Sequence, residues 1–265
     1  AADAAAMQID PISPAEAIAR VPILNPATLG HAAIADHAQD VDTDRMIQIY
    51  ARTARQNGAV IVTGVRVSAL SQANGRWHAV WAGGEVRASV VVNAAGAWAD
   101  PVASLAGLAP LGLVPHRRSM ARIPAPDGED SRGWPMVFGA GETWYMKPDA
   151  GALIVSPADE DATTPHDAWA DDMVLAEGLA RYEAMVTAPV TRVLANWAGL
   201  RTFAPDRVPV IGFGSAAGFF WLAGQGGYGF QTAPAAARLA ADLIGGRAPD
   251  AAPGLVSALA PARFG

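Results

Sequence analysis

Cysteine is absent from this sequence of 265 residues. Its absence excludes disulfide bonds, thiolate metal sites and cysteine nucleophiles. The five histidines have no spacing typical of metal ligands, so we predict no metal site; they are His31, His37, His78, His116 and His166. The sequence also lacks Gly-x-Ser-x-Gly, and no serine–histidine–acid set is suggested. Hydrolysis through a serine or cysteine nucleophile is therefore not indicated.

Positive charge and long apolar runs are also scarce. Lysine and arginine number 19 against 25 acidic residues, which gives a formal net charge of −6. Without a basic run, nucleic acid and anionic membranes are not indicated as primary partners. The most apolar region, residues 90–114, is interrupted by Asn93, Asp100, Pro101 and Pro110, so it does not reach the length of a membrane span. We predict a cytoplasmic protein, with peripheral attachment to the inner membrane as the alternative.

A glycine finger of the form Gly-x-Gly-x-x-Gly is missing from the first half of the chain. Residues 1–3 carry neither an initiator methionine nor the cationic start of a signal peptide. We therefore expect a sequence that begins inside a longer pattern, with half of a nucleotide site present and half missing. The composition is globular, with 51% hydrophobic and 17% charged residues.

The first third of the chain reads as helices and buried strands. Ser13-Pro14-Ala15-Glu16 predicts a capping box at the start of a short helix. A second helix is expected from about residue 42 to Asn57-Gly58, followed by a short buried strand at 59–63. Residues 65–70 and 77–81 predict a hairpin around Asn74-Gly75, and 89–93 a fully buried strand. This order fits one half of a nucleotide-binding layer.

From residue 101 to 196 the pattern changes to short strands with one helix at about 170–184, which predicts an antiparallel, substrate-facing sheet. The chain then returns to a buried strand at 219–223, a glycine-dense turn and a helix at 233–244. We predict a mixed α/β (α+β) fold in which the nucleotide-binding layer is discontinuous in sequence.

The glycine-dense turn Gly224-Gln225-Gly226-Gly227-Tyr228-Gly229 and Arg201 are the strongest chemical signal. Glycine permits positive φ and close approach of a ligand to backbone N–H groups, and the following helix directs its positive end to the same place. Arg201 lies in an apolar context, where a guanidinium must be paired, and its fork matches a carboxylate. The alternatives are a tight connection that needs glycine only for geometry, and an internal salt bridge from Arg201, for example to Asp206.

Other candidates are weaker when taken singly. Arg117 and Arg118 lie on a predicted strand, so one would face the sheet interior and the other solvent, although two surface arginines are the commoner pattern. Tyr145 could donate to a carboxylate or could be a core residue. Met136 and Phe138 share one face of a strand and could line an apolar pocket or pack in the core. The small residues of Val92-Asn93-Ala94-Ala95-Gly96 would let a phosphate or sugar approach the backbone, or simply end a strand.

Taken together, these stretches resemble the FAD-dependent D-amino-acid oxidase family. Nearly the whole chain is similar to its D-arginine dehydrogenase (D-amino-acid dehydrogenase) branch. The resemblance is carried by Val91–Trp98, Leu111-Gly112-Leu113, Arg117-Arg118-Ser119, Trp134-Pro135-Met136, Tyr145 with Lys147-Pro148-Asp149-Ala150-Gly151, Trp197-Ala198-Gly199-Leu200-Arg201, Gly218-Phe219-Phe220-Trp221 and the glycine turn.

The resemblance implies FAD as cofactor and two domains. The FAD-binding domain would comprise residues 38–98 and 199–265 and would lack its amino-terminal βαβ unit. The substrate-binding domain would comprise 1–37 and 99–198. The missing segment would come from a separate chain, from a nicked precursor, or from a part outside this sequence.

The resemblance also implies roles for single residues. Arg201 and Arg118 would bind the substrate carboxylate with help from Tyr145, and Gly227 would offer its carbonyl to the substrate amine. Met136 and Phe138 would line the side-chain pocket. Val67 would contact the adenine, Ala95 and Gly96 the pyrophosphate or ribose, and 226–231 the pyrimidine edge of the flavin. The implied cofactor-binding set is Val67, Ala95, Gly96, Gly199, Gly226, Gly227, Tyr228, Gly229, Phe230 and Gln231.

The implied reaction is oxidative deamination of a D-amino acid to a 2-oxo acid and ammonia by hydride transfer to flavin N5, with oxygen or a quinone as the final acceptor. Phe138 stands where the D-arginine branch carries a smaller aliphatic residue, which counts against a long cationic substrate side chain. Two alternatives stay open: a glycine- or sarcosine-type amine oxidase, and a non-catalytic subunit without a cofactor segment.

Overall fold

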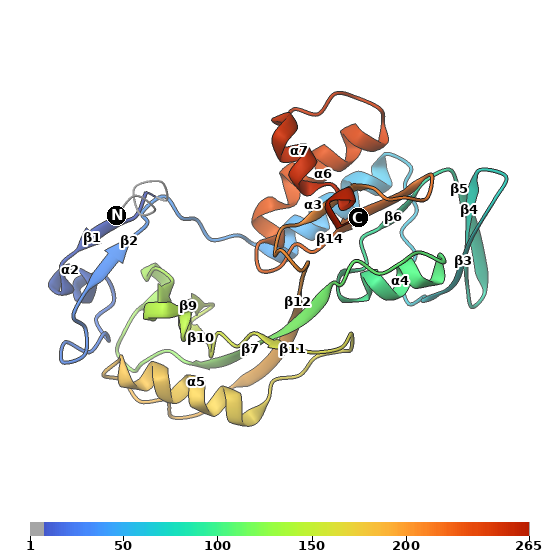
Figure 1. Cartoon of the computed structure of the whole chain (residues 1–265). Helices are drawn as coiled ribbons and strands as arrows, with labels where there is room; N and C mark the ends of the chain where they lie inside the picture. Colours follow the sequence, from blue (N-terminus) through green and yellow to red (C-terminus); the bar gives the residue numbers. More distant parts are fainter. Residues whose placement is uncertain (1–7, 265) are drawn as a thin grey trace. The chain divides into compact units, whose positions relative to one another are not determined.

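The computed structural model describes residues 8–264 and divides the chain into two compact units, whose elements are labelled in Figure 1. The first unit comprises Ala1–Gln39, Arg117–Ala162 and Asp167–Leu200, and the second comprises Asp40–His116, Thr163–His166 and Arg201–Gly265. Two of the boundaries fall inside long strands, since β7 (Val114–Pro124) and β12 (Ala195–Phe203) each contribute residues to both units. The predicted mixed α/β fold is confirmed.

The first unit is built on an antiparallel sheet. Strand β10 (Ala152–Ser156) pairs with β7 on one side and with β9 (Tyr145–Asp149) on the other. The remaining strands of this sheet are β8 (Val137–Phe138), β11 (Asp161–Ala162) and β12. Two short 3-10 turns, η2 (Ser131–Gly133) and η3 (Ala140–Glu142), lie between β7 and β9. The predicted antiparallel sheet is therefore present in this unit.

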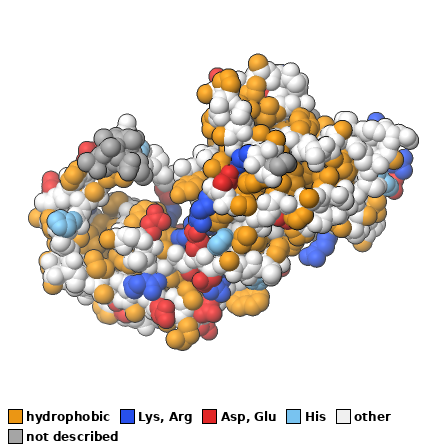
Figure 2. Space-filling view, viewed as in Figure 1, with side chains coloured by type: hydrophobic (Ala, Val, Ile, Leu, Met, Phe, Trp, Pro, Cys, Tyr) orange, Lys and Arg blue, Asp and Glu red, His pale blue; other side chains and the backbone are white. Residues whose placement is uncertain are grey.

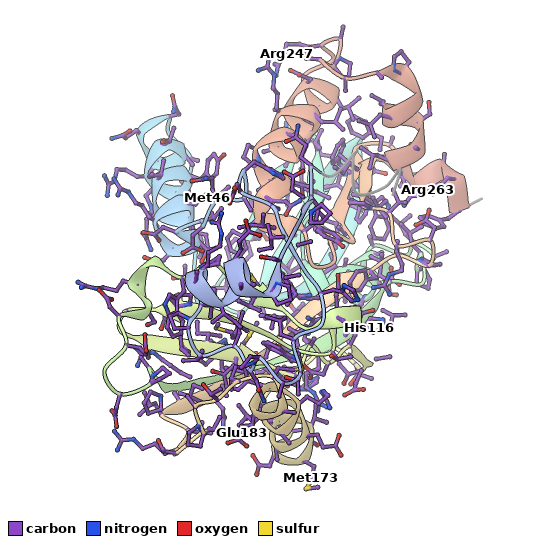
Figure 3. All side chains as sticks on the ribbon, turned by 90° about the vertical axis from the view of Figure 1, so that its left-hand side faces the viewer. Met46, His116, Met173, Glu183, Arg247 and Arg263 are labelled. Carbon is purple, nitrogen blue, oxygen red and sulfur yellow. The ribbon has the colours of Figure 1, made fainter. Side chains whose placement is uncertain are left out.

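Helix α5 (Asp172–Ala184) contributes to the core of this unit, in which Leu175 and Tyr182 pack with Met146 and Leu153 of the sheet. Gly178 permits the close approach, because a Cβ there would overlap Pro157. Figure 3 labels Met173 and Glu183 near the two ends of this helix. An antiparallel pair of strands, β1 (Asp10–Ile12) and β2 (Ala32–Ile34), and the short helix α2 (Pro14–Arg20) between them in sequence complete the unit.

The predicted capping box at the start of α2 is confirmed. The Ser13 hydroxyl accepts from the Glu16 N–H at 3.2 Å, and the Glu16 carboxylate accepts from the Ser13 N–H at 2.7 Å. The hydrogen bonds that the Glu16 carboxylate accepts from the Ser13 N–H and from the Ser13 hydroxyl lower the pKa of Glu16.

The second unit contains two three-stranded sheets. One is the antiparallel meander of β3 (Val67–Ala73), β4 (Arg76–Trp81) and β5 (Gly84–Ala88). Its predicted first turn is confirmed, since Asn74 and Gly75 both have positive φ between β3 and β4. In the other sheet, β14 (Phe219–Ala223) pairs antiparallel with β13 (Val210–Phe213) and parallel with β6 (Val91–Asn93).

Helices and turns surround these sheets. They are α3 (Thr43–Gln56), η1 (Gly96–Trp98), α4 (Ala99–Leu105), α6 (Gly229–Ile244), α7 (Pro253–Leu259) and η4 (Pro261–Phe264). One core joins Ala99 and Ala103 of α4 to Trp77 and Phe219, which is why residues 99–116 lie in this unit and not in the first one. The predicted boundaries placed 99–116 in the other domain, and which unit serves cofactor or substrate stays a prediction.

Three expected elements differ in the structure. Residues 59–63, predicted as a short buried strand, form no strand and are exposed. The strand predicted at 89–93 is shorter, Val91–Asn93, and Val92 is exposed. Helix α6 begins at Gly229, four residues before the predicted start, because the last glycine of the turn takes helical geometry. The first two differences share a cause: within residues 8–264, no strand pairs with 59–63 or with the second edge of β6.

No helix within residues 8–264 combines the length and apolarity that a membrane span would need.

Candidate functional site

The glycine turn of the second unit lies against the end of β12. The Gly226 N–H donates to the Thr202 carbonyl at 2.9 Å, and Phe203 and Gln225 form an isolated bridge. Gly224 and Gly226 have φ of 71° and 55°, in the left-handed region that favours glycine. A Cβ at Gly226 would overlap the Phe203 ring, so glycine is required there by packing as well.

The Arg201 guanidinium lies beside this turn. A Cβ placed on Gly227 would stand 3.0 Å from Arg201 Nη1, which puts the cation directly against the Gly227 backbone. The structure thus brings Arg201 and the glycine turn together. The alternative partner proposed for Arg201, Asp206, instead accepts from Arg263, at 2.6 Å (Nε–Oδ2) and 3.2 Å (Nη2–Oδ1). The hydrogen bond from Arg263 lowers the pKa of Asp206.

The start of α6 offers backbone N–H groups. Tyr228 is the N-cap residue and no side chain caps the helix. The N–H groups of a first helical turn have no intrahelical acceptor, and the helix dipole makes this end positive. Gly229, Phe230 and Gln231 occupy that turn. The end of the helix therefore suits a carbonyl oxygen or an anion.

The glycines of this turn also have the spacing of a dinucleotide finger, which the sequence-based prediction did not include. From Gly224 to Gly229 they read Gly-x-Gly-x-x-Gly, between a strand and a helix. A dinucleotide finger needs a second parallel strand after its helix. Within the described residues, α6 is followed by α7 and η4 and by no strand. The spacing therefore matches the finger without its βαβ context.

The end of β6 is a second open backbone region of this unit. The Asn93 side chain is buried, donates to the Ala99 carbonyl at 2.8 Å and accepts from the Ala95 N–H at 3.3 Å. Gly96 has a φ of 55°, and a Cβ there would meet no atom within 4 Å. A ligand could therefore approach this backbone closely. Val67, the other predicted contact in this unit, begins β3 and is half-buried.

In the first unit the structure brings Arg118, Tyr145 and Phe138 into one row. Arg118 is 8% exposed, and its guanidinium carbon lies 5.8 Å from the centroid of the Tyr145 ring. The Tyr145 and Phe138 rings are 5.7 Å apart. The Tyr145 hydroxyl donates to the Met120 sulfur at 3.3 Å. Phe138 and Met136 are exposed, so neither is a core residue within this unit.

Arg118 carries an unsatisfied donor. Its Nε is buried and has no hydrogen-bond partner, and its Nη2 lies 3.8 Å from Glu160 Oε2, a long ion pair. Glu160 was missed by the sequence analysis, since 42 positions separate it from Arg118 and no local pattern links the two. A buried cation held this loosely is suited to an additional anion.

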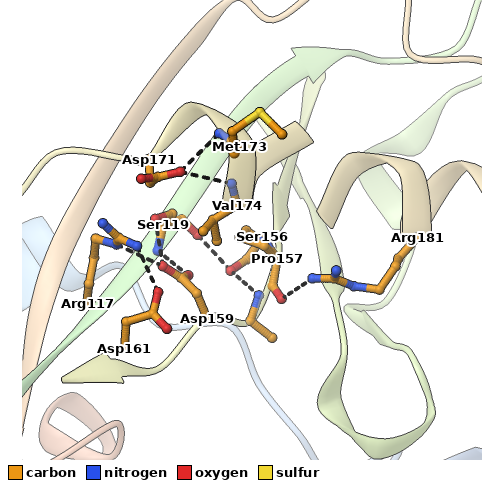
Figure 4. A network of polar contacts seen from close by, with 11 residues as sticks. Arg117, Ser119, Ser156, Pro157, Asp159, Asp161, Asp171, Met173, Val174 and Arg181 are labelled. Carbon is orange, nitrogen blue, oxygen red and sulfur yellow. Dashed lines mark hydrogen bonds and ion pairs between the residues drawn. The ribbon is translucent and has the colours of Figure 1, made fainter. Parts of the chain in front are cut away.

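The strand that carries Arg118 is fixed by Asp159, as Figure 4 shows. The Asp159 carboxylate accepts from the Ser119 N–H at 2.7 Å, from the Ser119 hydroxyl at 2.8 Å and from Arg117 Nε at 3.3 Å. Arg117 also donates to Asp161 at 2.8 Å. Arg117 was expected to face solvent or the interior; it is half-buried and held by two carboxylates, which leaves Arg118 as the arginine with an open donor.

The predicted residues therefore divide between the two units. Arg118, Met136, Phe138, Tyr145 and Gly199 belong to the first, whereas Val67, Ala95, Gly96, Arg201 and 226–231 belong to the second. Over residues 8–264, no three or more histidine, aspartate or glutamate side chains gather as a metal site would require.

Comparison with known proteins gives one family and several relatives. A family model described as DAO, FAD dependent oxidoreductase, matches residues 1–243. The glycine oxidase of Pseudomonas aeruginosa is 33% identical over 169 residues, or 63% of this chain and 44% of that protein. The D-amino acid dehydrogenase of Xanthobacter autotrophicus is 46% identical over 54 residues, or 20% of this chain and 13% of that protein.

Among solved structures, the glycine oxidase from Geobacillus kaustophilus is similar with a TM-score of 0.79 at 23% identity, over 94% of this chain and 66% of that chain. At this identity the likeness is one of fold. The chain spans less than half of the length of the curated relatives it matches.

Proposed function

Because the chain belongs to the DAO family of FAD-dependent oxidoreductases, we propose that it is the substrate-binding and flavin-facing portion of an enzyme that deaminates D-amino acids. The products would be a 2-oxo acid and ammonia. The D-amino acid dehydrogenase of Xanthobacter autotrophicus supports this substrate class through a stretch of 46% identity. The glycine oxidase likeness supports the broader statement that the donor is an amino acid.

One observation carries the proposal: Arg118 is a buried guanidinium whose Nε has no partner. An unsatisfied buried donor costs roughly 1–3 kcal/mol, which an arriving carboxylate would recover. The row of Tyr145 and Phe138 beside it would add an aromatic wall for the rest of the substrate. Arg118 would thus bind the carboxylate of an amino acid, and the two aromatic rings would contact its side chain.

FAD, the cofactor of this family, fits the residues of the second unit in part. FAD supplies an acceptor for the hydride that leaves the substrate α-carbon. The uncapped start of α6 and the glycine turn would hold its carbonyl-bearing pyrimidine edge, and the open backbone at Ala95 and Gly96 would accept the pyrophosphate or ribose. The first half of the sequence offers no glycine finger for the adenine half, so another polypeptide segment would have to provide it.

The chain's own residues would position the substrate. In this proposal Arg118 would bind the substrate carboxylate, as would Arg201 of the second unit, and the Tyr145 hydroxyl would exchange its weak sulfur acceptor for the substrate. The Gly227 carbonyl would accept from the amine and fix the α-hydrogen's direction. Met136 and Phe138 would contact the substrate side chain, which both can do because they are exposed within their unit.

A second candidate is oxidation of glycine or sarcosine. Phe138 favours it, because a large exposed ring in the side-chain pocket leaves less room for a long substrate side chain. The likeness to two glycine oxidases supports the same alternative.

The test uses the chain joined to, or mixed with, an amino-terminal segment that carries a strand, a glycine finger and a helix. The chain alone should not bind FAD tightly, because its first half carries no glycine finger for the pyrophosphate; tight binding with a structured visible spectrum would refute this. In the completed protein, anaerobic addition of D-alanine or D-phenylalanine should bleach bound FAD, whereas the L-enantiomers should not. Bleaching by glycine and sarcosine alone would establish the second candidate, and bound FAD that no amine reduces would indicate a non-catalytic subunit.

A further inference from the structure

Two neighbouring arginines of β7 contact different members of an acidic triplet. Arg117 and Arg118 follow each other on the strand, so their side chains leave its opposite faces. The triplet, which is Asp159, Glu160 and Asp161, leads into β11, and β11 pairs with β7. Its two outer members accept from Arg117 at 3.3 Å and 2.8 Å, as Figure 4 shows. The middle member, Glu160, reaches Arg118 instead, with its Oε2 3.8 Å from Arg118 Nη2.

Glu160 approaches Arg118 without satisfying it. An N–O distance of 3.8 Å is too long for a hydrogen bond, and Arg118 Nε has no hydrogen-bond partner. The Arg118 side chain is 9% exposed and that of Glu160 is 34% exposed, so water screens this pair only in part. Asp159, in contrast, uses both carboxylate oxygens on Ser119 and Arg117. Glu160 thus leaves Arg118 able to bind a further anion, and it places a negative charge beside that anion.

Aromatic rings form another side of the Arg118 environment. The Tyr145 ring centroid is 5.8 Å from the Arg118 guanidinium carbon, and the exposed Phe138 ring lies 5.7 Å from the Tyr145 ring. Neither ring is charged at neutral pH. Figure 2 shows acidic and basic side chains intermixed on the visible face of the first unit, so this face has no single sign of charge. The charge that a ligand on Arg118 meets is therefore set by Glu160 and not by a broad field.

We propose that Glu160 selects the ligand of Arg118 by charge. A carboxylate on Arg118 brings the rest of its ligand close to the Glu160 carboxylate. At a separation of roughly 7 Å in a partly exposed site, a second negative charge loses, and a positive charge gains, about three- to thirtyfold in affinity. The site therefore favours amino acids with a neutral or cationic side chain over those with an acidic one. This inference rests on the proposed function, because the amino acid is the ligand that the proposal assigns to Arg118.

Small benzoates test this selection on the chain itself, without flavin. Benzoate carries one carboxylate, isophthalate adds a second carboxylate at the meta position, and 3-(aminomethyl)benzoate adds a cation there. Calorimetry gives the Kd of each, and the ratio of each Kd to that of benzoate isolates the effect of the added charge. In the unmodified chain, isophthalate should bind about three- to thirtyfold more weakly than benzoate, and 3-(aminomethyl)benzoate should bind more tightly by a similar factor.

Substitutions in the acidic triplet assign the effect to one residue. Glu160→Gln keeps the shape of the side chain and removes its charge, so both Kd ratios should approach one. Glu160→Asp keeps the charge and should keep most of the preference. Asp161→Asn is the matched control, because it removes the same charge from the same segment, but from a side chain that is 60% exposed and pairs with Arg117. Its Kd ratios should stay within about twofold of those of the unmodified chain. Circular dichroism verifies that each variant folds.

Three results would overturn this inference. They are Kd ratios that Glu160→Gln leaves unchanged, an equal change in Asp161→Asn, and an absence of benzoate binding. The second would mean that net charge makes the selection, and the third that Arg118 takes no added anion.

The inference and the proposed reaction can fail separately. If the Kd ratios change as expected but no amine reduces flavin in the completed protein, the charge selection stands and the proposed reaction fails. If D-amino acids reduce the flavin but Glu160→Gln leaves the ratio of kcat/KM for D-aspartate and D-asparagine unchanged, the reaction stands and the charge selection fails.

Discussion

Replacing Asp159 by alanine tests the idea that one buried carboxylate holds the strand carrying Arg118. The Asp159 side chain is 3% exposed and accepts from the backbone and hydroxyl of Ser119 and from Arg117. Ser119 is itself fully buried, so both of its donors would lose their acceptor without access to water. Breaking a buried charged network by removing one partner costs about 3–5 kcal/mol.

The measurement is thermal unfolding followed by circular dichroism. A loss of this size should lower Tm by roughly 6–20 °C in a protein of this length. Asp161→Ala is the matched control, because Asp161 contacts the same Arg117 at 2.8 Å but its side chain is 60% exposed. An exposed ion pair is worth about 0–1 kcal/mol, so this variant should lose little stability.

A second readout follows Arg118. If Asp159 fixes the strand, Asp159→Ala should also weaken binding of a small carboxylate such as benzoate, whereas Asp161→Ala should not. Equal effects of the two substitutions on Tm would refute the reasoning, since burial would then have made no difference.

Three further predictions concern single contacts. Glu160→Gln should tighten benzoate binding by about two- to fivefold, because it removes the carboxylate that lies 3.8 Å from Arg118 and competes with benzoate for the guanidinium. Calorimetry measures the affinity, and weaker binding would contradict this prediction. Gly178→Ala should lower the free energy of unfolding in urea by about 1–3 kcal/mol, because the added Cβ would overlap Pro157. The control is Gly254→Ala in helix α7, where an added Cβ would meet no atom within 4 Å. This control should leave the free energy of unfolding unchanged or raise it by up to about 1 kcal/mol. Burial raises the pKa of Tyr182 from 10.0 to about 12. As the pH rises, the phenol of the unfolded chain therefore loses its proton before the phenol of the folded chain does. The free energy of unfolding should fall between about pH 10 and about pH 12 by up to roughly 2–3 kcal/mol. Tyr182→Phe, which has no proton to lose, should show a flatter alkaline profile, and an unchanged profile would exclude Tyr182 as the cause.

Elements that depend on neighbours in sequence could be predicted. The capping box at Ser13 and Glu16 and the hairpin at Asn74-Gly75 are complete within a few residues, and both form as expected. The glycine turn was recognised for the same reason, although its helix begins earlier because Gly229 tolerates helical geometry.

Features that depend on distant partners could not be predicted. Residues 59–63 have the composition of a buried strand, but a strand also needs a neighbour, and none is present in the described part of the chain. In the site, Arg118 could be chosen from the sequence, whereas its contact with Glu160 depends on how the chain returns to β7 after β10. The same holds for Asp159, whose role appears only once the fold places it beside Ser119.

Within residues 8–264 one edge of β6 has no neighbouring strand, and this has a consequence for the behaviour of the chain in solution. An apolar run and an open parallel edge in one unit are also what a growing aggregate uses as a template. We therefore expect this chain, when it is studied by itself, to associate with further copies through this edge as its concentration rises.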